Sequence, residues 1–403
     1  MQKTENAVPT TPRGEYFAVA DFLRVASISL VAWYHFWQQS WLNPNFSVGG
    51  KTVHLLGLVS SGYMMVDVLL VLSGFLLTVP YARARYEHRP PPSTADFYAK
   101  RFWRIFPSYC FAIAVVFLAF ALPEHSYPSA GKALGDLLMH LSFTHNLSTY
   151  SYLSTPLPGV LWTLAVEVQF YLFFPLLMKI YRKSPAAVCA GLTLAALAAR
   201  AWILLRAEDT TVLVNQLPCM LDLYACGMLA ATVYVSASAK KPGRVASWLS
   251  PVLALLCFLL LLQIVYVQPY GDYVEARRQQ MIWRLPVGLL SGYILLFGCL
   301  VSDRLGRIVG NPATRWLSAI SYNFYIWHQF LALQLKKWHI PPYVSEKPNA
   351  AGEAPWQLQY SILCFVAGIV LAALLTGLLE KSLVRYGRKR MKARREKAAI
   401  PQA

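Results

Sequence analysis

The sequence predicts an all-α fold: a polytopic integral membrane bundle of about ten transmembrane helices, with one short interfacial or re-entrant helix. Of the 403 residues, 56% are hydrophobic and 14% are charged, whereas soluble globular proteins carry about 25% charged residues. Mean hydropathy is +0.41, which also excludes disorder, because disordered chains have low hydrophobicity. Ten apolar windows, each close to the length of about 20 residues that a bilayer requires, give the helix number.

The predicted spans follow one another through short connections. They lie near 16–38, 55–80, 104–122, 159–180, 186–206, 213–235, 248–268, 282–302, 315–337 and 358–380. The first window does not resemble a cleaved signal peptide, because it is too long and contains Asp21 and Arg24. The stretch 133–147 is apolar but too short to cross, so we expect the interfacial or re-entrant helix there.

Basic residues gather in alternate connections, which predicts the orientation. One set is rich in Lys and Arg, and the other is poor except near Lys336, Lys337 and Lys347. The positive-inside rule then places the basic set and both termini in the cytoplasm, across a bacterial-type inner or plasma membrane. The net charge is +18, and the densest basic run, Lys381–Lys397, directly follows an apolar stretch. This position is typical of an anchor to anionic lipid, so we expect membrane lipid rather than nucleic acid as the partner.

The domain organisation is simple. We expect a cytoplasmic N-terminal segment over 1–15, one transmembrane domain over 16–385 and a basic cytoplasmic tail over 386–403. The seven cysteines lie in apolar stretches without a CxxC pair, which indicates packing rather than disulfides or a metal site. We therefore expect no metal and no permanently bound cofactor.

The first span carries three ionisable residues, Asp21, Arg24 and His35. Arg24 and His35 are eleven residues apart, so they share one helix face at a separation of about 16 Å. Each such group costs about 2.5–3.5 kcal/mol in a bilayer on insertion scales, so this face is expected to line a polar interior. The alternative is a structural ion pair between Asp21 and Arg24, with His35 merely interfacial.

The next polar groups lie in the second and third spans. Ser73 and Gly74 form a small-residue step, for which close helix packing is the simpler interpretation. Arg101 and Arg104 lie three residues apart on one helix face at the predicted cytoplasmic boundary. Guanidinium groups bind phosphate well, although contact with lipid head groups explains the same spacing.

Later spans supply further candidates for chemistry. Glu167 and Tyr171 lie four residues apart on one face of the fourth span, and the ninth carries Tyr325 and His328. We predict that an anionic donor docks on the inner arginines and passes its reactive end to a His35–Glu167 pair. A carboxylate that orients an imidazole is a common arrangement for general-base catalysis on a hydroxyl group.

Several of these spaced motifs together resemble the acyltransferase-3 family. These membrane acyltransferases O-acetylate lipopolysaccharide O-antigen, peptidoglycan and exported polysaccharides, and the resemblance extends from about 16 to 385. The motifs are Arg24 with His35, Ser73-Gly74-Phe75, Arg101-x-x-Arg104, Trp162 with Glu167-x-Gln169-Phe170-Tyr171 and Pro175, and Ser321-Tyr322-x-x-Tyr325-x-x-His328. The sequence departs from the family pattern at Thr163, at Val168 and in Glu380-Lys381-Ser382, which lacks a frequent proline.

The resemblance implies transfer of an acyl group, usually acetyl, from cytoplasmic acyl-CoA as co-substrate to a hydroxyl of a carbohydrate or glycolipid acceptor. His35 would be the essential histidine, with Arg24 as its companion and Glu167 as its acidic partner. Arg101 and Arg104, together with Ser73, would bind the donor. Asp21, Tyr171, Tyr325 and His328 are expected to support the site.

Two other classes of function fit part of the pattern. A transporter or flippase would use the intramembrane charges as a substrate or proton path, and substrate counterflow without CoA would identify it. A non-catalytic membrane scaffold would tolerate loss of Arg101 or Glu167. The sequence leaves open the acceptor, the acyl chain length, the side of acylation, the oligomeric state, and the choice between direct transfer and a covalent acyl-enzyme.

Overall fold

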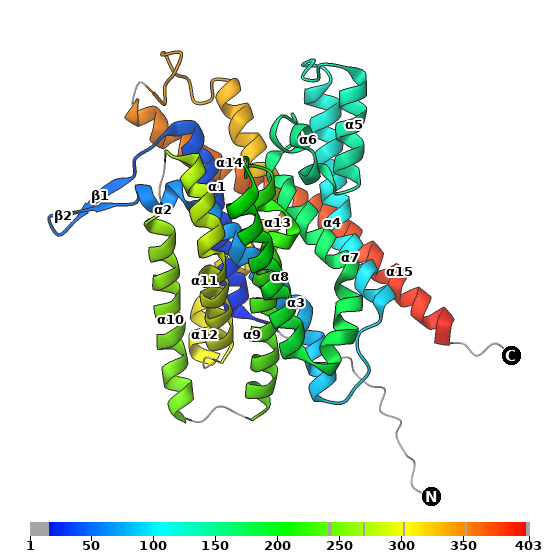
Figure 1. Ribbon diagram of the computed structural model, residues 1–403. Coiled ribbons are helices and arrows are strands. Elements are labelled where there is room, and N and C mark those ends of the chain that lie inside the picture. The colour runs from blue at the N-terminus through cyan, green and yellow to red at the C-terminus, as the bar shows by residue number, and fades with distance from the viewer. Residues whose placement is uncertain (1–15, 241–243, 269–270, 301–302, 351–352, 400–403) are drawn as a thin grey trace, which may run out of the picture.

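The computed structural model describes residues 16–240, 244–268, 271–300, 303–350 and 353–399, and these ranges are almost entirely helical (Figure 1). This confirms the predicted all-α class, while the predicted N-terminal segment 1–15 lies outside the described residues. The longer helices are α1 (Ala18–Ser40), α3 (Met65–Tyr86), α4 (Thr94–Val116), α5 (Ala130–Leu141), α7 (Trp162–Lys183), α8 (Pro185–Arg206), α9 (Leu221–Ala239), α10 (Arg244–Tyr266), α11 (Tyr273–Cys299), α13 (Pro312–Lys337), α14 (Ala354–Leu375) and α15 (Lys381–Ala399).

Short elements complete the chain. They are helices α2 (Leu56–Ser60), α6 (Thr149–Leu153) and α12 (Asp303–Val309), several 3-10 turns, and π-helical turns at Phe117–Ala121 and Thr376–Glu380. Strands β1 (Asn45–Val48) and β2 (Lys51–His54) form an antiparallel hairpin that the sequence analysis did not predict. Gly49 and Gly50, both with positive φ, form its two-residue turn.

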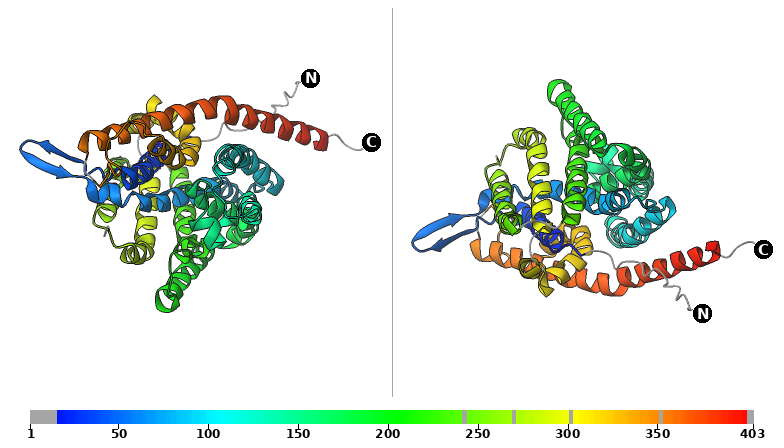
Figure 2. Two further views of the ribbon diagram at one scale, coloured as in Figure 1. Left: turned by 90° about the horizontal axis from the view of Figure 1, so that it is seen from above. Right: turned by 90° about the horizontal axis from the view of Figure 1, so that it is seen from below.

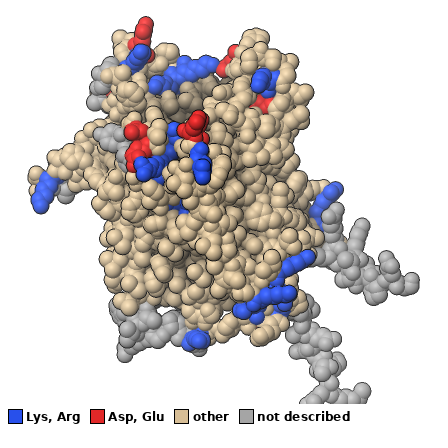
Figure 3. Space-filling view, in the orientation of Figure 1, with Lys and Arg blue, Asp and Glu red and all other residues tan. Residues whose placement is uncertain are grey.

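Eight described helical segments are long and apolar enough to cross a membrane, and they correspond to eight of the ten predicted windows. The other two windows fold as α1 and α13, of 23 and 26 residues. Polar and charged side chains lower the hydropathy of these two helices, which pack against each other. On the face shown in Figure 3, Lys, Arg, Asp and Glu gather towards the two ends of the molecule and leave an uncharged band between them.

The two ends of the bundle carry different connections. Helices α5 and α6 lie at one end (top right in Figure 1) and the hairpin projects sideways from the same half of the molecule, whereas the α3–α4 and α7–α8 connections lie at the other end. The distribution of Lys and Arg in the sequence predicts the same division of these connections between the two sides of the membrane. The predicted interfacial stretch folds as α5, whose 12 residues extend only about 18 Å and are too short to span.

Helices α3 and α9 approach each other closely through two glycines. A Cβ atom on Gly74 would overlap the carbonyl oxygen of Tyr224, and one on Gly227 would overlap the carbonyl oxygen of Val71. Only a residue without a side chain fits at either position. The predicted packing role of the Ser73-Gly74 step is therefore confirmed, and it places Ser73 beside the cavities described below.

Two buried ion pairs join the helices that flank this contact. Arg200 on α8 bonds Asp222 on α9 at 2.6 and 2.9 Å, and Arg284 on α11 lies 3.4 Å from Asp67 on α3. The four side chains are at most 3% exposed. Breaking a buried pair by removing one partner costs about 3–5 kcal/mol. Within the described chain, Asp67 and Asp222 thus have structural partners, which the sequence analysis did not identify.

We predict that Gly227→Ala destabilises the protein, because its methyl group must push α3 away from α9. Overpacking of this kind costs about 1–3 kcal/mol. Gly191→Ala on α8 is the matched control, since a Cβ atom there meets nothing within 4 Å. Thermal unfolding of the detergent-solubilised variants measures the difference. Equal unfolding temperatures for the two variants would show that the close contact contributes nothing to stability.

Candidate functional site

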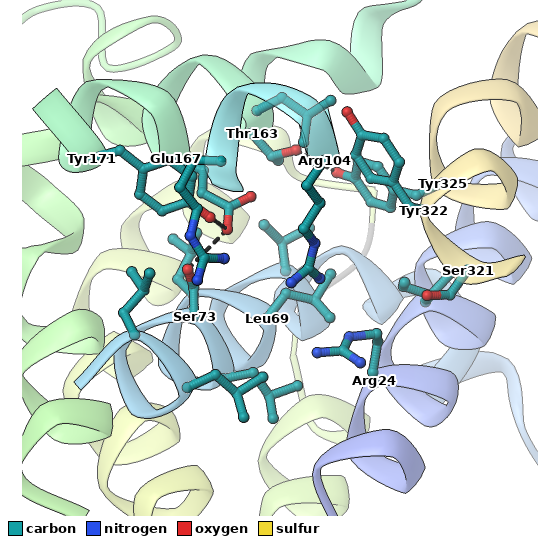
Figure 4. Close-up of a pocket in the computed structure, with 18 residues that line it drawn as sticks. Arg24, Leu69, Ser73, Arg104, Thr163, Glu167, Tyr171, Ser321, Tyr322 and Tyr325 are labelled. Atoms are coloured by element: carbon teal, nitrogen blue, oxygen red, sulfur yellow. Dashed lines mark hydrogen bonds between the residues drawn. The ribbon is translucent and has the colours of Figure 1, made fainter. Parts of the chain in front are cut away.

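A small cavity, here called the middle cavity, lies among α1, α3, α4, α7 and α13 and holds about 110 Å³ (Figure 4). Segments far apart in the sequence each contribute polar side chains to its wall. These side chains are Arg24, Ser73, Arg101, Arg104, Thr163, Glu167, Tyr171, Ser321, Tyr322 and Tyr325. The structure therefore brings together seven of the ten predicted site residues and leaves Asp21, His35 and His328 outside this wall.

Glu167 is held in the middle cavity by two hydroxyl groups. Ser73 Oγ donates to Glu167 Oε1 at 2.8 Å, and the Tyr171 hydroxyl donates to the same oxygen. The Arg101 guanidinium lies over the Tyr171 ring, 5.5 Å from its centroid. The predicted proximity of Glu167 and Tyr171 is confirmed. Glu167 thus belongs to a cluster with the arginine that was predicted to bind the donor.

Arg24 takes part in a separate polar cluster at the α1–α13 contact. Its Nη1 atom lies 3.2 Å from Asp21 Oδ1 and donates to Ser318 Oγ at 3.0 Å. Ser318 in turn donates to Asp21 Oδ1 at 2.6 Å. The Asp21–Arg24 ion pair, considered above as an alternative, is therefore present. Arg24 nevertheless also lines the middle cavity. It is therefore both a member of a structural ion pair and a residue that lines a polar interior.

A larger cavity of about 880 Å³, here called the basic cavity, adjoins the middle cavity, and the two share Arg24, Arg101, Arg104, Ser321 and Tyr322. Six basic and two acidic side chains line it: Arg24, Lys100, Arg101, Arg104, Arg315, Arg388, Asp21 and Glu380. Such an excess of positive charge favours an anionic ligand. The sequence analysis did not identify Lys100, Arg315 and Arg388 as site residues. It placed them in connections and in the tail, and the sequence alone does not show that these segments meet at one cavity.

A third cavity of about 690 Å³, here called the outer cavity, contains His35. Its other lining groups include aromatic rings, side-chain amides, aliphatic residues and one cation, Arg277; among the rings and amides are Tyr34, Tyr63, Tyr152, Trp162, Tyr273, Gln38 and Gln280. Such a wall offers flat apolar faces and hydrogen-bonding groups together. It can therefore contact a polar ligand that has both hydroxyl groups and exposed C–H surfaces.

His35 pairs with His328 across the α1–α13 contact. His35 Nδ1 lies 2.9 Å from His328 Nε2, and His328 Nδ1 lies 2.7 Å from the Tyr325 carbonyl oxygen. A carbonyl oxygen only accepts, so this network assigns the proton of neutral His328 to Nδ1. His328 Nε2 then accepts from His35 Nδ1, which leaves a lone pair on His35 Nε2. This is the tautomer that a general base requires.

The prediction that Glu167 is the partner of His35 is wrong. Glu167 lines the middle cavity, where Ser73 and Tyr171 bind it, whereas His35 lines the outer cavity and bonds His328. The physical reason is the helical rise, which carries His35 about 16 Å along α1 from Arg24. At that level α13 presents an imidazole. His328, predicted as a supporting residue, occupies the place assigned to the carboxylate.

The three cavities follow one another through the bundle. The basic and middle cavities share a wall of arginines, and the middle and outer cavities share Val66 and Tyr325. The Tyr325 hydroxyl is hydrogen-bonded to the Thr163 hydroxyl at 2.9 Å. Tyr325 also supplies the carbonyl that holds His328. Tyr325 therefore lies in the wall between the middle and outer cavities and also orients the histidine pair.

Comparison with known proteins places this arrangement in a family. The acyltransferase domain family matches residues 18–379. Nodulation protein 10 of Rhizobium leguminosarum bv. viciae is 28% identical over 258 residues, which are 58% of this chain and 65% of that protein. The putative peptidoglycan O-acetyltransferase of Bacillus subtilis is 24% identical over 79% of this chain and 49% of its own length.

Peptidoglycan O-acetyltransferase OatA of Listeria monocytogenes is 23% identical, over 78% of this chain and 49% of its own length. The chain thus spans about half the length of these two relatives and 65% of the first. No solved structure matches the chain. Because the family match covers nearly all of the helical bundle, the chain belongs to the acyltransferase domain family.

Proposed function

We propose that the chain transfers an acyl group, in the simplest case acetyl, from acyl-CoA to a hydroxyl group of a cell-envelope or exported carbohydrate. The observation that carries this proposal is the series of cavities that leads from the basic cavity to the His35–His328 pair. Two of the relatives named above are described as peptidoglycan O-acetyltransferases, one of them putatively. Their names support a glycan as the acceptor.

In this proposal the donor enters from the basic cavity, on the cytoplasmic side. Its phosphates contact Arg101 and Arg104, whose guanidinium groups suit bidentate phosphate binding. The thin arm of CoA then runs through the middle cavity, past Ser73, towards Tyr325. The small size of that cavity suits the unbranched β-alanine–cysteamine end of this arm. The acceptor occupies the outer cavity, where aromatic rings and amides contact the sugar.

The chemistry at His35 follows from its tautomer. His35 Nε2 removes the proton of the acceptor hydroxyl, and the hydroxyl oxygen attacks the thioester carbonyl carbon. The new C–O bond forms, the C–S bond breaks, and the imidazolium returns the proton to the thiolate to give an ester and free CoA. His328 Nε2 accepts from His35 Nδ1 throughout, so it fixes the tautomer and orientation of His35, without the negative charge that a carboxylate would add.

Glu167 acts at the donor end of the passage in this proposal. It orders Ser73 and Tyr171, and the Tyr171 ring supports the Arg101 guanidinium. Arg24 links the middle cavity to the Asp21–Ser318 cluster and fixes the register between α1 and α13. That register in turn sets the distance between His35 and His328. Arg24 is thus a positioning residue.

We predict that His35→Ala lowers acyl transfer by about 10²–10⁴-fold, because the general base is lost. Transfer of radiolabelled acetyl from acetyl-CoA into glycan, measured in membranes with matched amounts of folded protein, tests this. His328→Leu should cause a comparable loss, whereas His328→Gln should retain part of the activity because its amide oxygen can accept from His35 Nδ1. Label transfer that survives His35→Ala would contradict the role of His35.

Glu167→Gln should mainly weaken donor use. The amide oxygen can still accept one hydroxyl bond, but it holds Ser73 and Tyr171 less firmly than the carboxylate does. The Tyr171 ring then supports the Arg101 guanidinium less well, so we expect a raised KM for acetyl-CoA. The loss of kcat should be smaller than for His35→Ala, and the pH profile of kcat should keep its shape. Thr163→Val is a comparison variant on the same helix. It removes the hydroxyl that is hydrogen-bonded to Tyr325 and leaves Glu167 in place. A kcat loss equal to that of His35→Ala with unchanged KM would restore Glu167 as a partner of His35.

A further inference from the structure

Helix α15 packs against the bundle on the outside of α4. It continues from α14 through the π-helical turn at Thr376–Glu380, and the two helices form one long ribbon along the side of the bundle (Figures 1 and 2). It packs on α4 through Gly387, where a Cβ atom would overlap the indole of Trp103. The Tyr386 ring contacts the same indole in an edge-on arrangement at 5.5 Å. The described part of α15 is therefore docked on the helix that carries Arg101 and Arg104.

This docking turns one face of the C-terminal helical segment towards the basic cavity. The wall of that cavity includes Glu380, Val384, Arg388 and Met391, which recur at helical spacing. Arg385 and Arg388, three residues apart, are both exposed, but only Arg388 lines the cavity. The packing of α15 on α4 thus places Arg388, and not Arg385, in the wall of the basic cavity.

The cavity holds positive charge that its own acidic groups do not neutralise. Asp21 bonds Arg24 and Ser318, and Glu380 Oε2 accepts from Asn323 at 2.8 Å. Among the described residues, no carboxylate forms an ion pair with Lys100, Arg104 or Arg388. Three cations from two helices therefore face one cavity without a direct ion pair, and that arrangement favours an anionic ligand with several phosphate groups.

We propose that α15 forms part of the donor site and that Arg388 binds a phosphate group of the donor. This inference rests on the proposed function, and it assigns a binding role to the segment that the sequence indicated only as a lipid anchor. Acyl-CoA carries a diphosphate and a 3′-phosphate. These are more anionic groups than Arg101 and Arg104 can bind as bidentate pairs, so the site needs further cations from the cavity wall, and Arg388 supplies one from another helix. A lipid phosphate has the same chemistry, and the experiment below separates the two sources.

The test uses the full chain in nanodiscs of neutral phosphatidylcholine, with adenosine 3′,5′-bisphosphate as the probe. This compound carries phosphate groups of the donor without its thioester, so its binding is independent of catalysis. Loss of one charge-assisted contact should weaken binding by about tenfold in Arg388→Gln. Arg385→Gln is the matched control, since it removes the same charge from the same helix outside the cavity, and its affinity should equal that of the wild type.

The kinetic counterpart separates binding from chemistry. Arg388→Gln should raise the KM for acetyl-CoA by a similar factor and leave kcat nearly unchanged, because the contact is the same in the ground and transition states. Arg388→Lys should recover part of the loss, since it keeps the charge without the planar fork. Recovery also shows that the helix is folded and docked.

The contrary outcomes are distinct. Equal nucleotide affinities for Arg388→Gln and Arg385→Gln would overturn the role of α15. An effect of Arg388→Gln that appears only in nanodiscs with anionic phosphatidylglycerol would also overturn it, because the arginine would then bind lipid. Failure of the wild-type protein to bind the nucleotide would instead contradict the donor assigned under the proposed function, whatever Arg388 does.

Discussion

The contact between α1 and α13 is the constraint on which the rest of the site depends. Both helices carry polar groups that would be costly against lipid, so each must satisfy them against the other. Two contacts achieve this at different levels: Arg24 with Ser318 near one end, and His35 with His328 farther along. The same pairing that relieves the cost of burial also fixes the tautomer of His35. In the proposed mechanism, the stability of this contact and the ability of His35 to act as a base therefore have one physical cause.

Much of this architecture is predictable from the sequence, because hydropathy and helical spacing are local properties. They gave the helical spans, the shared face of Arg24 and His35, and the proximity of Glu167 and Tyr171. The pairing of side chains between helices is not local. Hydropathy alone says nothing about which helix lies beside α1, so the partner of His35 was assigned to Glu167 rather than His328. The hairpin and the docking of α15 depend on similar tertiary contacts.

The arrangement of charge along the passage explains how two dissimilar substrates could use one protein. Six cations line the basic cavity, while the outer cavity has a single one, Arg277, among aromatic rings, amides and aliphatic side chains. Between them lies a small space where Glu167, Ser73 and Tyr171 hold one another. A phosphate-rich molecule and a polar, uncharged one would thus bind on opposite sides of Tyr325. Only a narrow group needs to pass this residue for the two to meet.

The most direct test of this account is a cryo-electron microscopy structure of the full chain bound to a non-hydrolysable thioether analogue of acetyl-CoA. The account predicts phosphates in the basic cavity beside Arg101 and Arg104, and a sulfur atom at Tyr325. The acetyl carbon of the analogue should then be close enough to His35 for an acceptor oxygen, which reacts at about 3–3.5 Å, to lie between them. An analogue that ends at Glu167 with Tyr325 closed behind it, or that binds outside the three cavities, would contradict the account.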